Sequence, residues 1–253
     1  MTTRNGVAIV TGGARGIGRA IAFTLAEAGY WIVANYRSRD HDARELVEKI
    51  TAGGGQAKAF KVDVGVPEEA NRLVQSTLEA FGQIDVLVNN AGISISGVTF
   101  GEFPLEDWAE MLRVNLFAPF YLIKAVLPHM RERRSGRIIN LSSNVTIRFP
   151  AGYGPYTVSK AGLEALTRIL SKEEGPNGIR VNAIAPGPIQ TEMLGKALAV
   201  MGPERAEAFI KSVPLRRAGR PEEIASVVRF LVSEEASYIT GQVIYVNGGG
   251  PGG

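Results

Sequence analysis

A tyrosine and a lysine four residues apart, Tyr156 and Lys160, form the pair in this sequence best suited to proton transfer. In a helix this spacing places both side chains on one face. A phenol with a pKa of about 10 is a poor acid or base at neutral pH, but a neighbouring ammonium favours the phenolate and lowers that pKa. The pair could protonate a carbonyl or deprotonate an alcohol. In isolation, such a pair more often belongs to an ordinary amphipathic helix.

Two further polar residues turn this pair into a candidate catalytic site. Ser143 follows the apolar segment Arg137–Leu141, and its hydroxyl could hold a substrate oxygen near the phenol. The alternative for Ser143 is a serine that closes a turn. Asn115 interrupts an apolar helical pattern at about 106–133, and asparagine is a mediocre helix former. A water-mediated link to Lys160 would explain it, and so would a side chain bonded to the backbone.

A glycine-rich segment near the start of the chain is a candidate cofactor loop. The sequence TGGARGIG at residues 11–18, called the glycine loop below, follows a short apolar strand pattern and precedes a helical pattern. Glycines let the backbone approach a phosphate closely, and the next helix offers free amides to an anion. The spacing alone is weak evidence, since a glycine-rich turn can merely connect a strand to a helix. Its strand–loop–helix setting favours a nucleotide site that includes Gly12, Arg15, Gly16, Ile17 and Gly18.

The end of the second strand pattern indicates which cofactor the loop would bind. An NAD site usually has a carboxylate there, bonded to the adenosine ribose. Here residues 34–38 read ANYRS, and the first carboxylate is Asp40. Arg37 and Arg15 could instead hold a 2′-phosphate between two guanidinium groups. Both arginines could also be solvated surface residues. We therefore expect NADP rather than NAD.

Polar residues also follow the third and fourth strand patterns. Asp63 could accept a hydrogen bond from the adenine amino group, and the segment NNAG at 89–92 suits a backbone packed against a flat cofactor. An asparagine–glycine turn is the alternative for the second segment. This adds Asp63, Asn89, Ala91 and Gly92 to the expected cofactor site.

Short apolar segments alternate with helical patterns along the whole chain. Strands are expected at 7–10, 31–34, 57–62, 84–88, 137–141, 179–184 and 243–246, and helices at 17–28, 40–52, 67–81, 106–133, 154–174 and 221–232. This alternation predicts an α/β fold, one doubly wound, Rossmann-type parallel sheet of about seven strands with helices on both faces. We expect one domain over 1–253, with a substrate lid at about 187–215. Ligands should bind beyond the carboxyl ends of the strands.

Composition excludes several other classes of protein. The chain has no cysteine and two histidines, so no thiol chemistry, disulfide or histidine-rich metal site is expected. A net charge of +3 does not indicate nucleic acid binding. The first residues lead directly into an apolar strand pattern without a signal peptide, and no stretch of about 18 apolar residues suggests a membrane span. A cytoplasmic protein is expected.

With these motifs assembled, the chain resembles the short-chain dehydrogenase/reductase family over essentially its whole length. The resemblance rests on the glycine loop, Asp63, Asn89–Gly92, Asn115, Ser143, Tyr156, Lys160, Pro186-Gly187 and the segments ITGQ at 239–242 and VNGG at 246–249. It implies that Tyr156 acts as the acid/base and that Ser143 binds the substrate oxygen. It further implies that Lys160 binds the nicotinamide ribose and tunes the pKa of Tyr156, and that Asn115 carries a proton relay. It also implies cofactor contacts from Val64, Pro186, Gly187, Ile189 and Thr191, and a homotetramer.

Within this family the chain is most similar to the 3-oxoacyl-(acyl-carrier-protein) reductases of fatty acid biosynthesis. A basic cluster could dock an acidic carrier protein, although cations near the end of a helix are common without any partner; it comprises Arg131, Arg133, Arg134 and Arg137. Sugar, polyol and cyclic-alcohol dehydrogenases share the same frame and are the alternative. A non-catalytic NADP-sensing protein is a third possibility, but such a protein has no need of an intact proton donor.

Overall fold

The computed structural model describes residues 5–250. Residues 1–4, which were expected to lead directly into the first strand, and residues 251–253 of the expected domain lie outside the described residues. Within the described range, parallel strands form one seven-stranded sheet in the order β3-β2-β1-β4-β5-β6-β7. The strands are β1 (Gly6–Val10), β2 (Tyr30–Tyr36), β3 (Ala57–Lys61), β4 (Val86–Asn89), β5 (Gly136–Leu141), β6 (Ile179–Pro186) and β7 (Val243–Val246). The central strands β1 and β4 are buried along their whole length, because helices cover both faces. The predicted fold class is confirmed.

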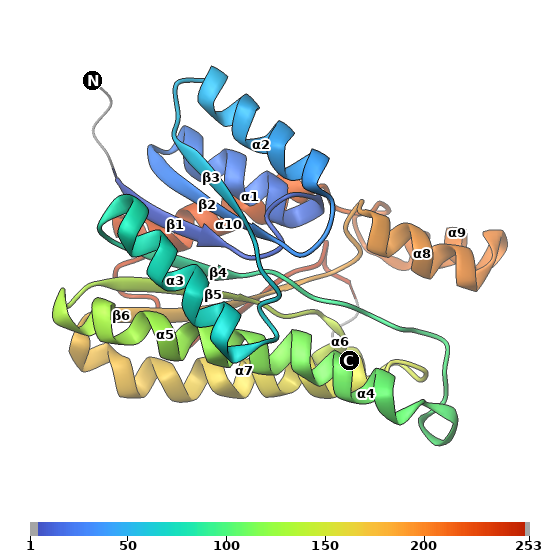
Figure 1. Ribbon diagram of the computed structural model, residues 1–253. Coiled ribbons are helices and arrows are strands. Elements are labelled where there is room, and N and C mark those ends of the chain that lie inside the picture. Colours follow the sequence, from blue (N-terminus) through green and yellow to red (C-terminus); the bar gives the residue numbers. More distant parts are fainter. Residues whose placement is uncertain (1–4, 251–253) are drawn as a thin grey trace.

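Helices form a layer on each face of this sheet (Figure 1). One layer contains α1 (Gly16–Glu27), α2 (Asp40–Ala52) and α10 (Pro221–Val232), and the other contains α3 (Pro67–Phe81), α5 (Ala118–Glu132) and α7 (Gly154–Glu174). The shorter helices are α4 (Leu105–Leu112), α6 (Val145–Arg148), α8 (Glu192–Met201) and α9 (Pro203–Ser212), with one-turn segments at Phe100–Glu102, Gly175–Asn177 and Glu234–Ala236.

Each layer buries one apolar stripe against the sheet. On one face, Ile21 and Leu25 of α1 pack with Val228 of α10 against the strands. On the other face, Leu73 of α3 and Leu122 of α5 pack in a second cluster. These side chains recur at the three- and four-residue spacing that the sequence displayed, so burial of the stripes holds the helices against the sheet. The strands are thereby fixed with their carboxyl ends along one edge.

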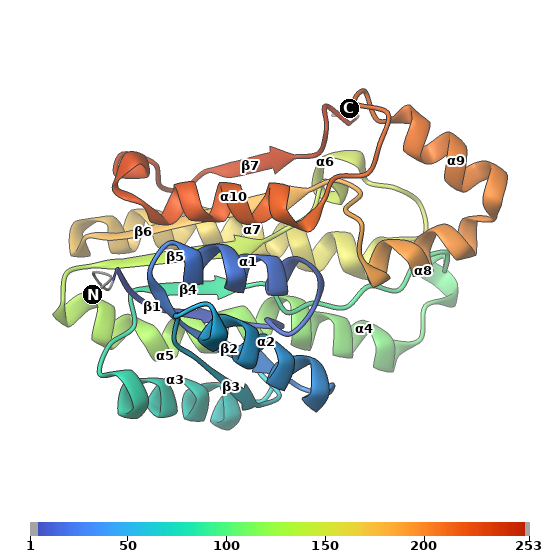
Figure 2. The same cartoon turned by 90° about the horizontal axis from the view of Figure 1, so that it is seen from above.

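The order of the strands creates a switch point at the centre of the sheet. β1 pairs with both β2 and β4, so the chain leaves β1 toward one side and later returns on the other. In such sheets a crevice opens beyond the carboxyl ends of the two central strands. Figure 2 shows α8 and α9 projecting beyond this same edge, away from the two main layers.

The structure differs from the sequence-based expectations at three segments. The predicted lid 187–215 contains two helices, α8 and α9, which its glycine and proline residues had concealed. The short helix α6 lies in the segment between Ser143 and Tyr156, where none was expected. The predicted helix 106–133 is interrupted by one π-helical segment, Arg113–Phe117, because it widens around Asn115.

That helical segment also qualifies the expectation that no stretch could cross a membrane. Leu105–Glu132 forms a continuous helical run of 28 residues, which by length and composition alone is long and apolar enough to cross a membrane. Half of its most apolar window is buried inside the fold, where α5 packs against β5 and α3. A core helix passes the same test, and its contacts with the sheet account for its apolar residues here.

Candidate active site

Three of the predicted catalytic side chains meet at the carboxyl edge of the sheet. Ser143 follows the end of β5, and Tyr156 and Lys160 lie in the first two turns of α7. The hydroxyls of Ser143 and Tyr156 share a hydrogen bond. The Lys160 ammonium lies 5.8 Å from the centre of the Tyr156 ring, as the four-residue spacing on one helical face requires.

Burial dominates the electrostatics of this cluster. It lowers the pKa of Lys160 to about 8, because the ammonium loses its hydration. Its Nζ instead donates a hydrogen bond to the carbonyl oxygen of Leu141 at 2.6 Å. Burial also raises the pKa of Tyr156, and the hydrogen bond from Ser143 offsets only part of that rise. The expected lowering of the Tyr156 pKa by Lys160 is therefore not found in the protein by itself, because Lys160 is directed at Leu141.

Asn115 lies in the π-helical segment and is fully buried. Its Oδ1 accepts a hydrogen bond from the Ile93 backbone amide at 2.9 Å, and its Nδ2 donates to the Ile93 carbonyl at 2.9 Å. Nδ2 also lies 3.1 Å from the hydroxyl of Ser159. Of the two sequence-based explanations, the structure shows the side chain bonded to backbone. Asn115 thus anchors the loop after β4 to the helix that carries Lys160.

A buried carboxylate beside the cluster, Glu164, was missed in the sequence. It lies one turn after Lys160, and its Oε1 accepts hydrogen bonds from Ser142 and Thr146, both at 2.7 Å. These two residues flank Ser143, so Glu164 ties the segment that carries Ser143 to α7. In the sequence, Glu164 is an ordinary helix-forming residue, and only the apolar stripe around it could have indicated that it is buried.

The glycine loop fits the phosphates of a dinucleotide. Within residues 5–250, no side chain caps the first amides of α1, and its first turn holds no carboxylate. These amides and the positive end of the helix dipole are therefore free for an anion. Gly12 and Gly16 adopt positive φ angles of 61° and 51°. A Cβ at Gly18 would collide with the carbonyl oxygen of Gly12, so the loop closes tightly over the start of α1 with Ile17 between the two glycines.

The loop is braced against the end of β4, next to it in the sheet. The Thr11 hydroxyl accepts hydrogen bonds from the amides of Asn90 and Ala91, at 2.9 and 3.0 Å. Asn89 points the other way, into the sheet, and its Nδ2 donates to Asn140 at 2.8 Å. Gly92 lies beside both Lys160 and Asn115, where a Cβ would come within 3.6 Å of the Lys160 Nζ. The predicted residues 89–92 thus link the glycine loop to the catalytic cluster.

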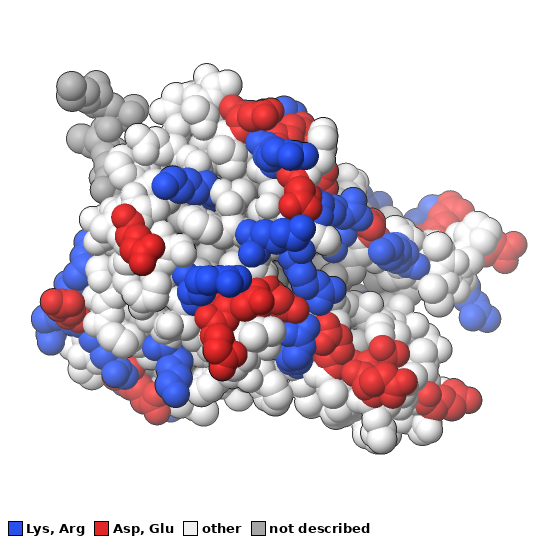
Figure 3. All heavy atoms as spheres, in the orientation of Figure 1, with Lys and Arg blue, Asp and Glu red and all other residues white. Residues whose placement is uncertain are grey.

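Charged side chains cluster at the ends of β2 and β3. Arg37 lies 3.2 Å from Glu110 and 3.8 Å from Asp63, next to Val64. The Asp63 carboxylate accepts two hydrogen bonds from Arg113, at 3.1 and 3.0 Å, and its pKa is lowered despite partial burial. Figure 3 shows basic and acidic side chains alternating over this surface, between α2 and α4. Arg37 and Arg15, which we expected to act together, have no common partner among the described residues.

Arg15 instead shares a carboxylate with Arg39, a residue that the sequence analysis did not single out. The Glu192 carboxylate lies 2.7 Å from Arg15 and 2.8 Å from Arg39. Arg39 has a left-handed backbone with φ 75° at the start of α2. Only three-dimensional proximity joins these residues, because Glu192 stands 177 positions after Arg15 in the chain.

The last predicted cofactor contacts lie at the end of β6. Pro186 closes the strand, and the Gly187 amide donates to the Val246 carbonyl at 3.0 Å. Ile189 is buried, while Thr191 caps α8 by accepting a hydrogen bond from the Leu194 amide at 3.4 Å. All predicted catalytic and cofactor residues thus lie along one edge of the sheet.

The predicted docking cluster lies at the opposite edge, around the start of β5. Arg131 pairs with the buried Glu174, Arg133 with Asp85 at 2.9 Å, and Arg137 with Glu234. Arg134 donates instead to the backbone carbonyl of Pro176 at 2.7 Å. Among residues 5–250, Arg134 is therefore the member of the cluster whose charge no carboxylate neutralises.

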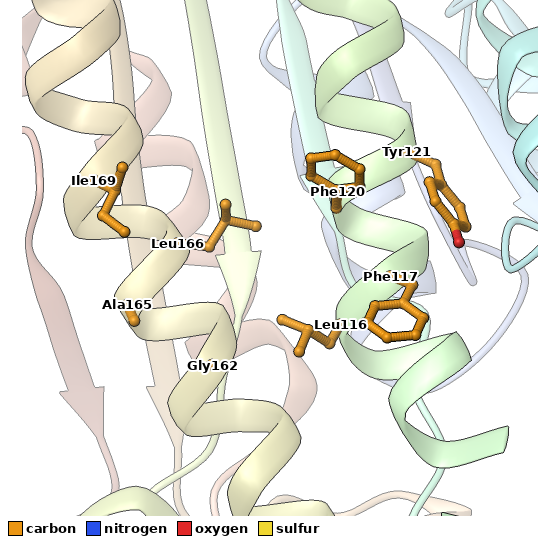
Figure 4. A pocket seen from close by; sticks show the side chains of 8 residues that line it. All are labelled: Leu116, Phe117, Phe120, Tyr121, Gly162, Ala165, Leu166 and Ile169. Atoms are coloured by element: carbon orange, nitrogen blue, oxygen red, sulfur yellow. The ribbon is translucent and has the colours of Figure 1, made fainter. Parts of the chain in front are cut away.

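An apolar groove of about 510 Å³ runs between α5 and α7, outside the catalytic edge. Figure 4 shows Leu116, Phe117 and Phe120 on one wall and Leu166 and Ile169 on the other. Phe117, Phe120 and Ile169 are each more than two-fifths exposed, although large apolar side chains usually avoid water when they are grouped. This surface has the character of a protein–protein interface.

Comparisons with known proteins agree with this geometry. A family model described as enoyl-(acyl carrier protein) reductase matches residues 12–250. A 3-oxoacyl-(acyl-carrier-protein) reductase of Synechocystis sp. is 41% identical over 244 residues, which cover 96% of each chain.

Solved structures are similar over nearly the whole chain. A variant of a Serratia marcescens short-chain dehydrogenase/reductase superposes with a TM-score of 0.90 at 34% identity, covering 97% of this chain and 98% of that one. A blue fluorescent protein from a metagenomic library, solved in complex with NADPH, has a TM-score of 0.90 at 36% identity, covering 98% of this chain and 99% of that one. By fold, motifs and similarity over nearly its full length, the chain belongs to the short-chain dehydrogenase/reductase family, whose members are oxidoreductases that use a nicotinamide cofactor.

Proposed function

We propose that this protein is an NADPH-dependent carbonyl reductase that acts on 3-oxoacyl thioesters, in one catalytic domain covered by the lid 187–215. The observation that carries the proposal is the meeting of Ser143, Tyr156 and Lys160 at the edge where the glycine loop ends. The names of the Synechocystis relative and of the matching family model support an acyl-carrier thioester as substrate.

In this proposal Tyr156 gives its proton to the substrate oxygen, while the Ser143 hydroxyl donates a hydrogen bond to the same oxygen. When bound, the nicotinamide supplies the hydride in reduction and accepts it in oxidation. Lys160 would hold the cofactor ribose, and its ammonium would favour the phenolate form of Tyr156 only once it turns from the Leu141 carbonyl toward the phenol. Its pKa of about 8 lies close to neutral pH, so the ammonium can release and regain a proton during turnover. Asn115 would anchor the loop beside Lys160 and support the proton relay.

NADP would be held by the glycine loop and by the basic residues at the ends of β1 and β2. The α1 amides suit the pyrophosphate, and the exposed guanidinium group of Arg15 suits a 2′-phosphate. Arg37 would join it only by leaving Glu110 and Asp63, with which it pairs in the protein by itself. Asp63, with Val64, would contact the adenine. Pro186, Gly187, Ile189 and Thr191 would surround the nicotinamide. The NADPH in the metagenomic neighbour supports this choice of cofactor.

Apolar side chains on α8 and at the end of α6 favour an acyl substrate over a sugar. Phe149, Met193 and Val200 are between about two-fifths and seven-tenths exposed. The segments that carry them meet, because the Gly97 amide donates to the Gly152 carbonyl at 3.0 Å and Gly97 lies against Val200. Sugars and polyols would instead need hydrogen-bonding groups at these positions.

A comparison of substrates tests the proposal. NADPH oxidation is followed with an acetoacetyl thioester, a hexose, a cyclic ketone and a quinone, and then with NADH in place of NADPH. We expect the highest kcat/KM for the thioester with NADPH. A higher kcat/KM for the hexose or the cyclic ketone would overturn the assignment of substrate, and a higher value with NADH would overturn the assignment of cofactor.

We further propose that carrier docking depends on Arg134, the cluster member without a carboxylate partner in residues 5–250. The cluster lies across the sheet from Ser143 of the same chain, so a docked carrier would serve the site of a neighbouring subunit. Arg134→Glu should lower kcat/KM for an acyl-carrier thioester and spare a small acyl thioester. Equal losses with both substrates would refute docking at this cluster.

The apolar groove supports assembly with further copies of the chain, and we retain the prediction of a homotetramer. Phe120→Glu places a charge in the groove and should shift sedimentation toward smaller species. Lys124→Glu is a control, since Lys124 lies one turn further along α5 and does not line the groove. An unchanged tetramer in Phe120→Glu would place the interface elsewhere. The prediction of a cytoplasmic protein rests on the sequence.

A further inference from the structure

Glu192 is a carboxylate held by three cations at the mouth of the predicted cofactor site. It lies 2.7 Å from Arg15, 2.8 Å from Arg39 and 3.2 Å from Lys196. Arg39 has a second acidic neighbour, Asp42, at 3.8 Å. Three positive charges thus face two negative ones, and this small excess of positive charge favours further anions.

These contacts join the lid to the body of the protein. Glu192 lies in the first turn of α8, directly after Thr191, whereas Arg15 precedes α1 and Arg39 precedes α2. The first turn of α8 lies close to the glycine loop, because a Cβ at Gly16 would come within 3.4 Å of the Thr191 methyl group. One carboxylate therefore connects the lid helix with both segments that would surround an adenosine ribose.

Arg15 and Arg39 are also better placed for one shared anion than the pair expected from the sequence. Both guanidinium groups reach the same carboxylate, so an anion of similar size can contact both at once. Arg37 is directed toward Glu110 and Asp63 instead. A phosphate carries more negative charge than a carboxylate and has three acceptor oxygens, so it would compete well for this pair.

We propose that Glu192 competes with the 2′-phosphate of NADP for Arg15 and Arg39, so that binding of the phosphorylated cofactor releases the first turn of α8. This inference rests on the proposed preference for NADP. It makes Arg39 a determinant of cofactor specificity and couples that specificity to the position of the lid. NAD, which has no 2′-phosphate, would leave the contacts of Glu192 in place.

Binding of nucleotide fragments tests this without turnover. The dissociation constants of 2′,5′-ADP and 5′-AMP are measured by calorimetry for the wild type, Glu192→Gln and Glu204→Gln, the last being an exposed carboxylate in the first turn of α9. We expect Glu192→Gln to bind 2′,5′-ADP more tightly, because the competing carboxylate is gone. The gain should be only roughly threefold to tenfold, because exposed ion pairs of this kind are weak. Its affinity for 5′-AMP and both affinities of Glu204→Gln should match the wild type.

Hydrogen exchange gives a second readout on the lid itself. We expect 2′,5′-ADP, but not 5′-AMP, to speed amide exchange in the first turn of α8 in the wild type. Unchanged or weaker binding of 2′,5′-ADP by Glu192→Gln, or an equal gain for 5′-AMP, would overturn the competition while leaving the NADP preference intact. If the wild type bound 2′,5′-ADP no more tightly than 5′-AMP, the NADP preference would fail, and the competition with it.

Discussion

Lys160 is buried as a cation, and this burial should make the stability of the protein depend on pH in a defined way. The fold lowers its pKa from 10.5 to about 8. Between these values the unfolded chain binds more protons at this site than the folded chain, so the free energy of unfolding rises with pH. The cost of the buried charge is complete below pH 8 and disappears above pH 10.5. At about 1.4 kcal/mol per pKa unit, the difference amounts to roughly 3 kcal/mol.

A variant without the charge isolates this contribution from the other titrating groups. Urea unfolding of the wild type and Lys160→Met is compared at pH 7 and at pH 10.5. Lys160→Met also loses the hydrogen bond to Leu141. This loss lowers the stability of the variant at both pH values, so it cancels when the change in unfolding free energy from pH 7 to pH 10.5 is compared between the two proteins. We expect the wild type to gain roughly 3 kcal/mol relative to the variant on going to pH 10.5. A relative gain below about 0.5 kcal/mol would refute the lowered pKa.

Three further predictions concern the cofactor loop, Glu164 and the positive end of α1. Gly18→Ala should weaken nucleotide binding roughly tenfold, since its Cβ would collide with backbone, whereas Gly53→Ala, with φ −78°, should bind normally in the same titration. Glu164→Ala should lower the free energy of unfolding by roughly 1–3 kcal/mol and reduce kcat, because Ser142 loses its acceptor. Glu164→Gln should restore most of the stability and most of kcat. If it restored neither, Glu164 would not position Ser143. Ile17→Glu should weaken binding of 5′-AMP, because a carboxylate in the first turn of α1 opposes a second anion at the positive end of the helix; an unchanged affinity would contradict this.

Much of the fold could be predicted because its signals are local. Helices α2, α3, α7 and α10 begin and end at the predicted residues, since apolar periodicity and flanking glycine or proline residues mark them. The strands are short and apolar, so they were predicted to within a few residues. Because ligand sites of such sheets lie beyond the carboxyl ends of the strands, the position of Ser143 directly after a strand pattern predicted that it lies near Tyr156.

The remaining features depend on contacts between distant segments. Glu192 and Arg39 look like ordinary surface residues until α8 brings them together. Glu164 looks like a solvated helix residue until the segment after β5 supplies its hydrogen-bond donors, Ser142 and Thr146. The direction of the Tyr156 pKa shift also depends on three-dimensional detail. Lys160 reaches the Leu141 carbonyl, so desolvation outweighs the neighbouring charge that spacing alone had suggested.

The central claim is that Tyr156 transfers the proton in the reduction of a carbonyl. The most direct test is single-turnover oxidation of bound NADPH by an acetoacetyl thioester, in the wild type and in Tyr156→Phe. The variant keeps the ring beside Lys160 and loses only the hydroxyl that is bonded to Ser143. The account predicts that the rate falls at least about 100-fold while NADPH still binds. A variant that reduces the thioester as fast as the wild type would contradict it.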